Sequence, residues 1–133
     1  MKVYVFGNED ISDDNRTFKV VKKLEEEFHS IKFKFVKPNE DLPFIDEKDI
    51  IILDTVEGID KTTLISDEKI ENFILSPRAS VHDFDLGFQL RYLKKLGKLG
   101  KVKIIGIPMT GNLNYRRISS IFKKLVAQDI QGS

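Results

Sequence analysis

The chain has 133 residues, of which 41% are hydrophobic and 32% charged, with a formal net charge of +1. This length supplies one hydrophobic core but not two, so we expect a single domain over residues 1–133. The hydrophobic fraction excludes a wholly disordered chain. The absence of cysteine excludes disulfides, thiolate metal sites and a cysteine nucleophile, and two histidines are too few for a histidine-rich metal cage. Any metal site must therefore use carboxylates.

The sequence has no apolar run near the roughly 20 residues that a membrane-spanning helix needs. Its first ten residues, MKVYVFGNED, turn acidic before an apolar signal-peptide region develops. We therefore expect a cytoplasmic protein with no membrane partner.

Charge is divided unevenly along the chain. Residues 86–133 carry ten basic residues and one acidic residue, whereas residues 1–85 carry 20 acidic and 12 basic residues. A basic segment can attract nucleic acid, but this one lacks interleaved surface aromatic residues, and most of its lysines fall on polar helix positions. We expect a solvated surface and no nucleic-acid partner.

The first predicted elements alternate between strand and helix. Residues 2–6 form a short apolar run that predicts a buried strand. The next segment, with Asp13 or Asp14 as N-cap, has apolar residues at helical spacing up to Phe28. Residues 31–35 alternate apolar residues with lysines, which predicts a half-exposed strand at an edge of the sheet.

The middle of the chain contains a central strand and an irregular stretch. Residues 49–54 include four consecutive aliphatic residues, which predict a strand covered on both faces. Residues 55–77 show little regularity. Within them, residues 62–65 and 73–75 fit either a small hairpin or short extra strands.

The last third again alternates helix and strand, with a helix expected after Asp83, a buried strand over residues 102–107 and a final helix after Asn114. Strands that alternate with helices predict a three-layer α/β fold, an open, mostly parallel sheet with helices on both faces. Ligands of such sheets bind beyond the carboxyl ends of the strands. The functional residues should therefore follow the strands over 2–6, 49–54 and 102–107.

Acidic residues follow two of these strands. The loop from Gly7 to Asn15 has four acids in six positions, although capping the next helix needs one. Asp54 ends the central strand, where a buried carboxylate is costly unless it is paired, protonated or bound to a cation. These carboxylates are candidates for a cation site.

The two histidines differ in their surroundings. His82 directly precedes the helix predicted after Asp83. The N-terminus of a helix favours the neutral imidazole, which is the form that binds a metal ion. His29 lies among lysines and glutamates at the end of the first helix, and we expect it to be structural.

The candidate segments come in a fixed order along the chain: Gly7-Asn8, the pair Asp13-Asp14, the segment from Asp54 to Gly58, Ser80-Val81-His82, and the strand Ile104–Pro108 with the sequence IIGIP. This order and spacing resemble the hydrogenase maturation endopeptidases, over about residues 2–108. In that family the first loop reads approximately GNxLxxDDG, the strand-end acid begins a D-A-x-x-x-G segment, and a histidine follows a short loop. The chain departs from this pattern at 15–17, where Asn-Arg-Thr replaces the usual glycines, and at Thr55, which replaces alanine.

The resemblance implies an endopeptidase, directed by a metal ion, that removes a C-terminal extension from the large-subunit precursor of a nickel–iron hydrogenase. It implies that nickel, supplied with the substrate, is contacted by Asp14, Asp54 and His82. Asp14 and Asp54 are then the candidate catalytic residues, and the choice of proton acceptor between them stays open. Gly7 and Asn8 are the candidate substrate-binding residues. The oligomeric state is not implied.

Other functions remain open from the sequence. A homologue could bind metal or a hydrogenase subunit without cleaving it. A receiver-like domain would use Asp54 as the phosphate acceptor, although the acidic pair lies too far beyond the first strand and no Lys-Pro dipeptide follows the last one. A nucleotide-binding module is disfavoured because no Walker loop occurs and acids follow the first strand.

Overall fold

The computed structural model describes residues 1–6, 15–36, 47–56, 59–66 and 100–131. Its elements in chain order are β1 (Lys2–Phe6), α1 (Asn15–Glu27), β2 (Lys32–Val36), β3 (Asp49–Val56), β4 (Thr63–Ile65), β5 (Lys101–Pro108) and α4 (Tyr115–Gln131). The strands form one sheet in the order β2-β1-β3-β5-β4, in which β4 pairs antiparallel and the others parallel. The expected α/β fold with an open, mostly parallel sheet is confirmed.

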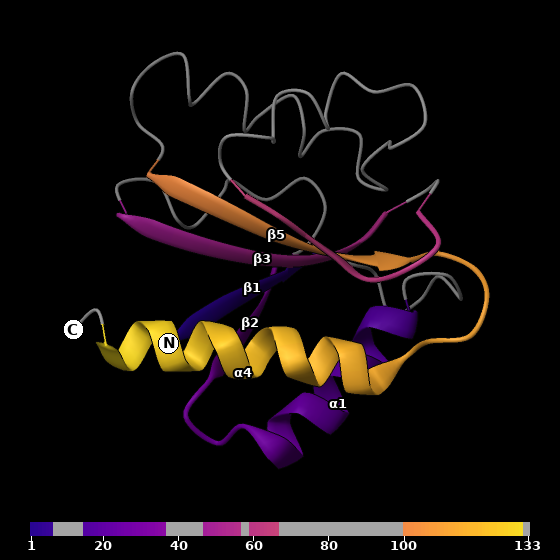
Figure 1. Cartoon of the computed structure of the whole chain (residues 1–133), viewed down its shortest axis with the longest axis horizontal. Helices are drawn as coiled ribbons and strands as arrows, with labels where there is room; N and C mark the ends of the chain where they lie inside the picture. The colour runs from indigo at the N-terminus through magenta and orange to yellow at the C-terminus, as the bar shows by residue number, and fades with distance from the viewer. Residues whose placement is uncertain (7–14, 37–46, 57–58, 67–99, 132–133) are drawn as a thin grey trace.

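Helices α1 and α4 pack on the same face of the sheet (Figure 1). Their inward residues share one core cluster with alternate residues of the central strands, namely Val3, Val5, Val20, Val21, Leu24, Ile31, Leu53, Ile105, Ile107, Ile118, Phe122 and Leu125. This clustering follows from two sequence periods, because strand residues alternate between faces and helix residues return to the same face every three or four positions.

The opposite face of the sheet is also buried. Tyr4, Ile50, Ile52 and Ile104 are all at most 1% exposed, and they alternate with the residues that face the helices. A sheet enclosed on both faces is what the continuous aliphatic run in β3 predicts. The helix expected after Asp83 lies outside the described residues.

The two edge strands differ in how well the sequence indicated them. Strand β2 is an edge strand as expected, and Lys32 and Lys34 are exposed on it while Phe33 packs against the core. Strand β4 realises the expectation of a short extra strand over residues 62–65, and its partner is β5. Residues 73–75, the other half of the possible hairpin, lie outside the described residues.

Helix α4 begins where the sequence predicted. The Asn114 side-chain oxygen accepts a hydrogen bond of 3.2 Å from the backbone N–H of Arg117. Asn114 therefore caps the helix by satisfying one of its free amide groups. The predicted cap of α1, at Asp13 or Asp14, lies outside the described residues.

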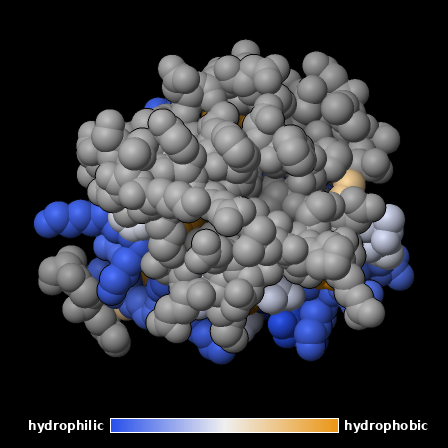
Figure 2. Space-filling model, turned by 90° about the horizontal axis from the view of Figure 1, so that it is seen from above, coloured by the Kyte–Doolittle hydropathy of each residue, from blue (hydrophilic) through white to orange (hydrophobic). Residues whose placement is uncertain are grey.

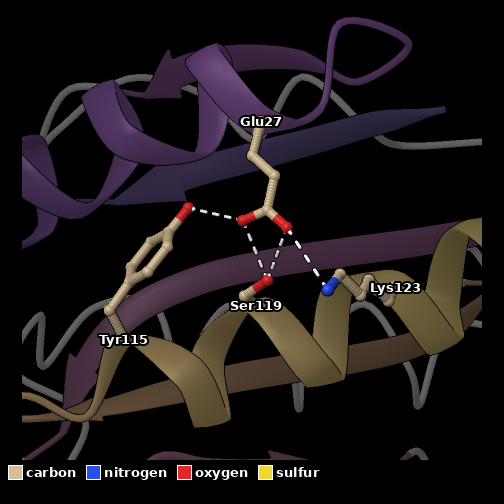
Figure 3. A network of polar contacts seen from close by, with 4 residues as sticks. All are labelled: Glu27, Tyr115, Ser119 and Lys123. Carbon is tan, nitrogen blue, oxygen red and sulfur yellow. Dashed lines mark hydrogen bonds and ion pairs between the residues drawn. The ribbon is translucent and has the colours of Figure 1, made fainter.

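Glu27 joins the end of α1 to α4. Its carboxylate accepts hydrogen bonds from the Ser119 hydroxyl (2.8 and 2.7 Å) and from the Tyr115 hydroxyl (3.0 Å), and it lies 3.7 Å from Lys123 Nζ (Figure 3). The hydrogen bond from Ser119 is the main reason why the pKa of Glu27 is lowered. Burial and the neighbouring Glu27 raise the pKa of Tyr115 to about 12. The two helices are thus joined by polar contacts as well as by the core.

The outer surface of the described part is mostly polar. Hydrophilic residues lie along the margin of the molecule in the view from above (Figure 2). Among the described residues, no helix has the length and apolar character needed to cross a bilayer.

Candidate active site at the carboxyl ends of the strands

The carboxyl ends of β1, β3 and β5 lie at one edge of the sheet, which we call the site edge. Val5 pairs in register with Leu53, and the next residue of β3, Asp54, pairs with Gly106. Phe6, Asp54 and Gly106 therefore end up in one row across three strands. The expectation that the segments after these strands share an edge is confirmed for the strand ends themselves.

Asp54 is a buried carboxylate at this edge. Its side chain is only 1% exposed, and its Oδ1 atom accepts a hydrogen bond of 2.8 Å from the backbone N–H of Thr55. Because Leu53 faces the helices, Asp54 lies on the opposite face of the sheet. Burying a carboxylate is unfavourable unless it is protonated, paired or bound to a cation, so this residue is the strongest functional candidate in the described part of the chain.

Gly106 shapes the surface next to Asp54. A Cβ atom at this position would lie 3.0 Å from Val56 Cγ2 and 3.4 Å from Ile59 Cδ1. The side chains of Val56 and Ile59 thus cover the backbone of β5 beside the carboxylate. An apolar neighbourhood of this kind strengthens the interaction of Asp54 with any charge brought to it.

Thr55 and Thr17 place two hydroxyl groups under α1. Thr55 faces the helices, Thr17 lies on the inward side of α1, and both are at most 1% exposed. Neither Oγ1 atom has a hydrogen-bond partner in the part of the chain that the structure describes. The sequence marks Thr55 only as a replacement for alanine and gives no sign that its hydroxyl group is buried.

Arg16 is a residue of the site edge that the sequence did not indicate. Its guanidinium donates hydrogen bonds to the carbonyl oxygens of Pro108 (3.1 Å) and Gly111 (2.5 Å). The arginine thereby joins the first turn of α1 to the chain that leaves β5. No local sequence pattern signals such a contact, because its partners are 92 and 95 positions away.

The remaining predicted site residues, Gly7, Asn8, Asp14 and His82, lie outside the described residues, so their roles stay predictions. The residues that are described hold no group of three or more histidine, cysteine or acidic side chains able to bind a metal ion. The nickel site therefore also stays a prediction. His29 lies exposed at the end of α1 with Nε2 2.9 Å from the Glu26 carbonyl oxygen, as expected for a structural residue.

A hollow lies at the other end of the sheet. Its volume is about 260 Å³, and its lining includes the first residues of β3 and β5 and the end of α4. The lining carries charges of both signs, from the acidic residues Asp49 and Asp129 and the basic residues Lys101 and Lys103. Because these residues lie at the amino ends of the central strands, the hollow is separate from the site edge.

Comparison with known proteins gives a structural likeness only. No protein-family model and no curated protein matches the sequence. The hydrogenase maturating endopeptidase HybD from Escherichia coli superposes with a TM-score of 0.65 at 16% identity, over 99% of this chain and 94% of that one. The chain has the fold of a hydrogenase maturation endopeptidase.

Two further solved structures also match. An endopeptidase from Escherichia coli gives a TM-score of 0.57 at 16% identity, over 85% of this chain and 79% of that one. A hydrogenase 2 maturation peptidase from a Thaumarchaeota archaeon gives a TM-score of 0.49 at 22% identity, over 98% of both chains. The likeness to the two proteins from Escherichia coli agrees with the resemblance that the order of the sequence motifs indicated.

Proposed function

We propose that this protein is an endopeptidase that removes a C-terminal extension from the large-subunit precursor of a nickel–iron hydrogenase. The observation that carries the proposal is the buried carboxylate of Asp54 at the carboxyl end of the central strand β3. It lies where open α/β sheets bind their ligands, in a chain with the fold of maturation endopeptidases. On this proposal the protein acts in the cytoplasm on a protein substrate, without a nucleic-acid or membrane partner.

Nickel would arrive as part of the substrate. Two carboxylates and an imidazole, from Asp14, Asp54 and His82, would contact it and leave open positions for the precursor. Asp54 fits this role as far as the structure describes it, because a buried anion at a strand end is favoured by a nearby cation. A divalent ion in such a site polarises a carbonyl group or activates water.

The chain's own residues would orient the substrate and move one proton. The backbone N–H of Thr55 holds Oδ1 of Asp54 and thereby fixes the direction of the carboxylate. Asp54 or Asp14 would accept a proton from the attacking water, as general bases in hydrolases do. Gly7 and Asn8 would contact the peptide beside the scissile bond.

The receiver-like alternative is weakened by the sheet order. In receiver domains the strand that follows the third one lies next to it, in the order 2-1-3-4-5. Among the strands described here, β5 lies next to β3, and the short β4 pairs antiparallel at the edge. Incubation with a small phosphodonor and magnesium should therefore leave Asp54 unmodified.

The proposal is tested by incubating the protein with a nickel-loaded large-subunit precursor and measuring the mass of the product. Loss of a C-terminal peptide is the expected result. A precursor that binds the protein but keeps its full mass would instead identify a non-cleaving homologue. A precursor that neither binds nor changes mass would contradict both readings.

A further inference from the structure

Arg16 connects two segments of the site edge that are far apart in the sequence. It is the second residue of α1, and its two terminal nitrogen atoms donate to two different carbonyl groups, those of Pro108 and Gly111. A guanidinium is planar and presents its donors in a fixed arrangement. The two bonds therefore restrain both the position and the orientation of the first turn of α1 relative to the end of β5.

The chain after β5 has a defined conformation at the contact. Gly111 has a φ of +83°, and a Cβ atom there would have nothing within 4 Å. The glycine is therefore required for its left-handed backbone conformation and not for packing. The turn that brings the Gly111 carbonyl to Arg16 is thus specified by the sequence.

The contact lies close to Asp54. Pro108 pairs in register with Val56, two residues beyond Asp54 on the neighbouring strand. With about 4.8 Å between strands and about 3.3 Å per residue, the Cα atoms of Asp54 and Pro108 lie roughly 8 Å apart. In the sequence, Asp14 precedes Arg16 by two residues.

We propose that Arg16 is a positioning residue of the site edge, which holds the start of α1 at a fixed distance from the strand beside Asp54. Catalytic groups on separate segments act together only when their separation is maintained to within a fraction of an ångström. The inference rests on the proposed function. Arg16 lies within residues 15–17, where the chain departs from the glycines of the family that its motifs resemble.

Arg117 provides a matched control. Its Nε atom donates a hydrogen bond of 2.6 Å to the carbonyl oxygen of Thr62, which joins α4 to the start of β4. The contact has the same chemistry as those of Arg16 and also links distant segments. It does not involve α1, so its loss should affect stability without releasing the first turn of that helix.

The experiment compares Arg16→Ala, Arg16→Lys and Arg117→Ala by hydrogen exchange and by processing kinetics on the nickel-loaded precursor. In Arg16→Ala, the amides of residues 109–113 should exchange at least tenfold faster, and kcat should fall at least tenfold with KM within twofold. Arg16→Lys keeps the positive charge and one donor nitrogen, so its kcat should be higher than that of Arg16→Ala. Arg117→Ala should leave kcat and the exchange at 109–113 within twofold of the wild type.

Two results from the variants would overturn the positioning role. Unchanged exchange at residues 109–113 in both Arg16 variants would show that the side chain does not restrain this segment. Equal losses of kcat in Arg16→Ala and Arg117→Ala would show a general effect on stability. A wild-type protein that leaves the precursor intact would refute the proposed function, and the positioning role with it, while the exchange data would still report whether the link exists.

Discussion

Asp54 on β3 and Gly106 on β5 lie directly opposite each other in the parallel ladder. Asp54 is the only ionisable residue of the central run Ile50–Val56. The pairing places it beside a glycine, which has no side chain. The space above Gly106 is taken by Val56 and Ile59. One side of the candidate site is therefore built from tightly packed aliphatic groups.

The first prediction concerns this packing. Gly106→Ala should lower the free energy of unfolding by about 1–3 kcal/mol, because the added methyl group lies only 3.0 Å from Val56 Cγ2. Urea denaturation of Gly106→Ala, Val56→Ala and the double variant measures it. The double variant should be more stable than the sum of the two single effects predicts. Strict additivity would show that the two side chains do not compete for the same space.

The second prediction concerns the Thr55 hydroxyl. Thr55→Val has nearly the same shape but no hydroxyl, and the wild-type hydroxyl is buried without a partner among the described residues. We expect the variant to be more stable by about 1 kcal/mol in urea denaturation, since an unsatisfied buried polar group is costly. A clear loss of stability would mean that the hydroxyl makes a hydrogen bond in solution.

The third prediction concerns Glu27 and pH. Its pKa in the folded state is below the ordinary value of 4.5, chiefly because of the hydrogen bond from Ser119. The unfolded state therefore takes up the proton first as pH falls. The stability that the carboxylate contributes is fully present above pH 4.5 and is lost as the pH falls through the lowered pKa.

Glu27→Gln should accordingly be less stable than the wild type at pH 7, and the difference should shrink in the acid range. Urea denaturation at pH 7 and at a pH below 4.5 measures the difference in the free energy of unfolding. Glu25→Gln is the control, because Glu25 is exposed on the same helix and its side chain makes no hydrogen bond or ion pair within the described residues. A difference for Glu27→Gln that is constant with pH would refute the assigned pKa shift.

The fourth prediction concerns the source of the metal. A site with two carboxylates, one imidazole and several open positions should bind nickel weakly until the substrate completes it. Calorimetric titration of the purified protein should give micromolar or weaker binding, reduced further in His82→Ala. Nickel that stays bound through treatment with a chelator would show that the protein carries its own metal.

The sequence predicted the elements whose pattern has a clear physical cause. Strand β3 was recognised because a strand buried on both faces needs consecutive aliphatic residues, which residues 50–53 provide. Helix α4 was recognised from its apolar spacing and from Asn114 at its start. Asp54 was identified as a candidate because a carboxylate at the end of such a strand is energetically costly.

The features that the sequence missed depend on tertiary contacts. A short strand was expected over residues 62–65 and is present as β4, but its partner and its antiparallel direction could not be predicted, because the pairing with β5 sets both. The hydrogen bonds of Arg16 to Pro108 and Gly111 join positions that no local pattern relates. The burial of the Thr55 hydroxyl depends on α1 lying above it, which only the assembled fold establishes.

The most direct test of the central claim is the processing assay with Asp54→Asn. The amide has the shape of the carboxylate and keeps an oxygen that accepts the hydrogen bond from the Thr55 N–H, but it carries no negative charge. We predict that the nickel-loaded precursor keeps its full mass, with processing reduced by about 100-fold or more, while the melting temperature stays close to that of the wild type. Processing at the wild-type rate by Asp54→Asn would contradict the assignment of this carboxylate to the active site.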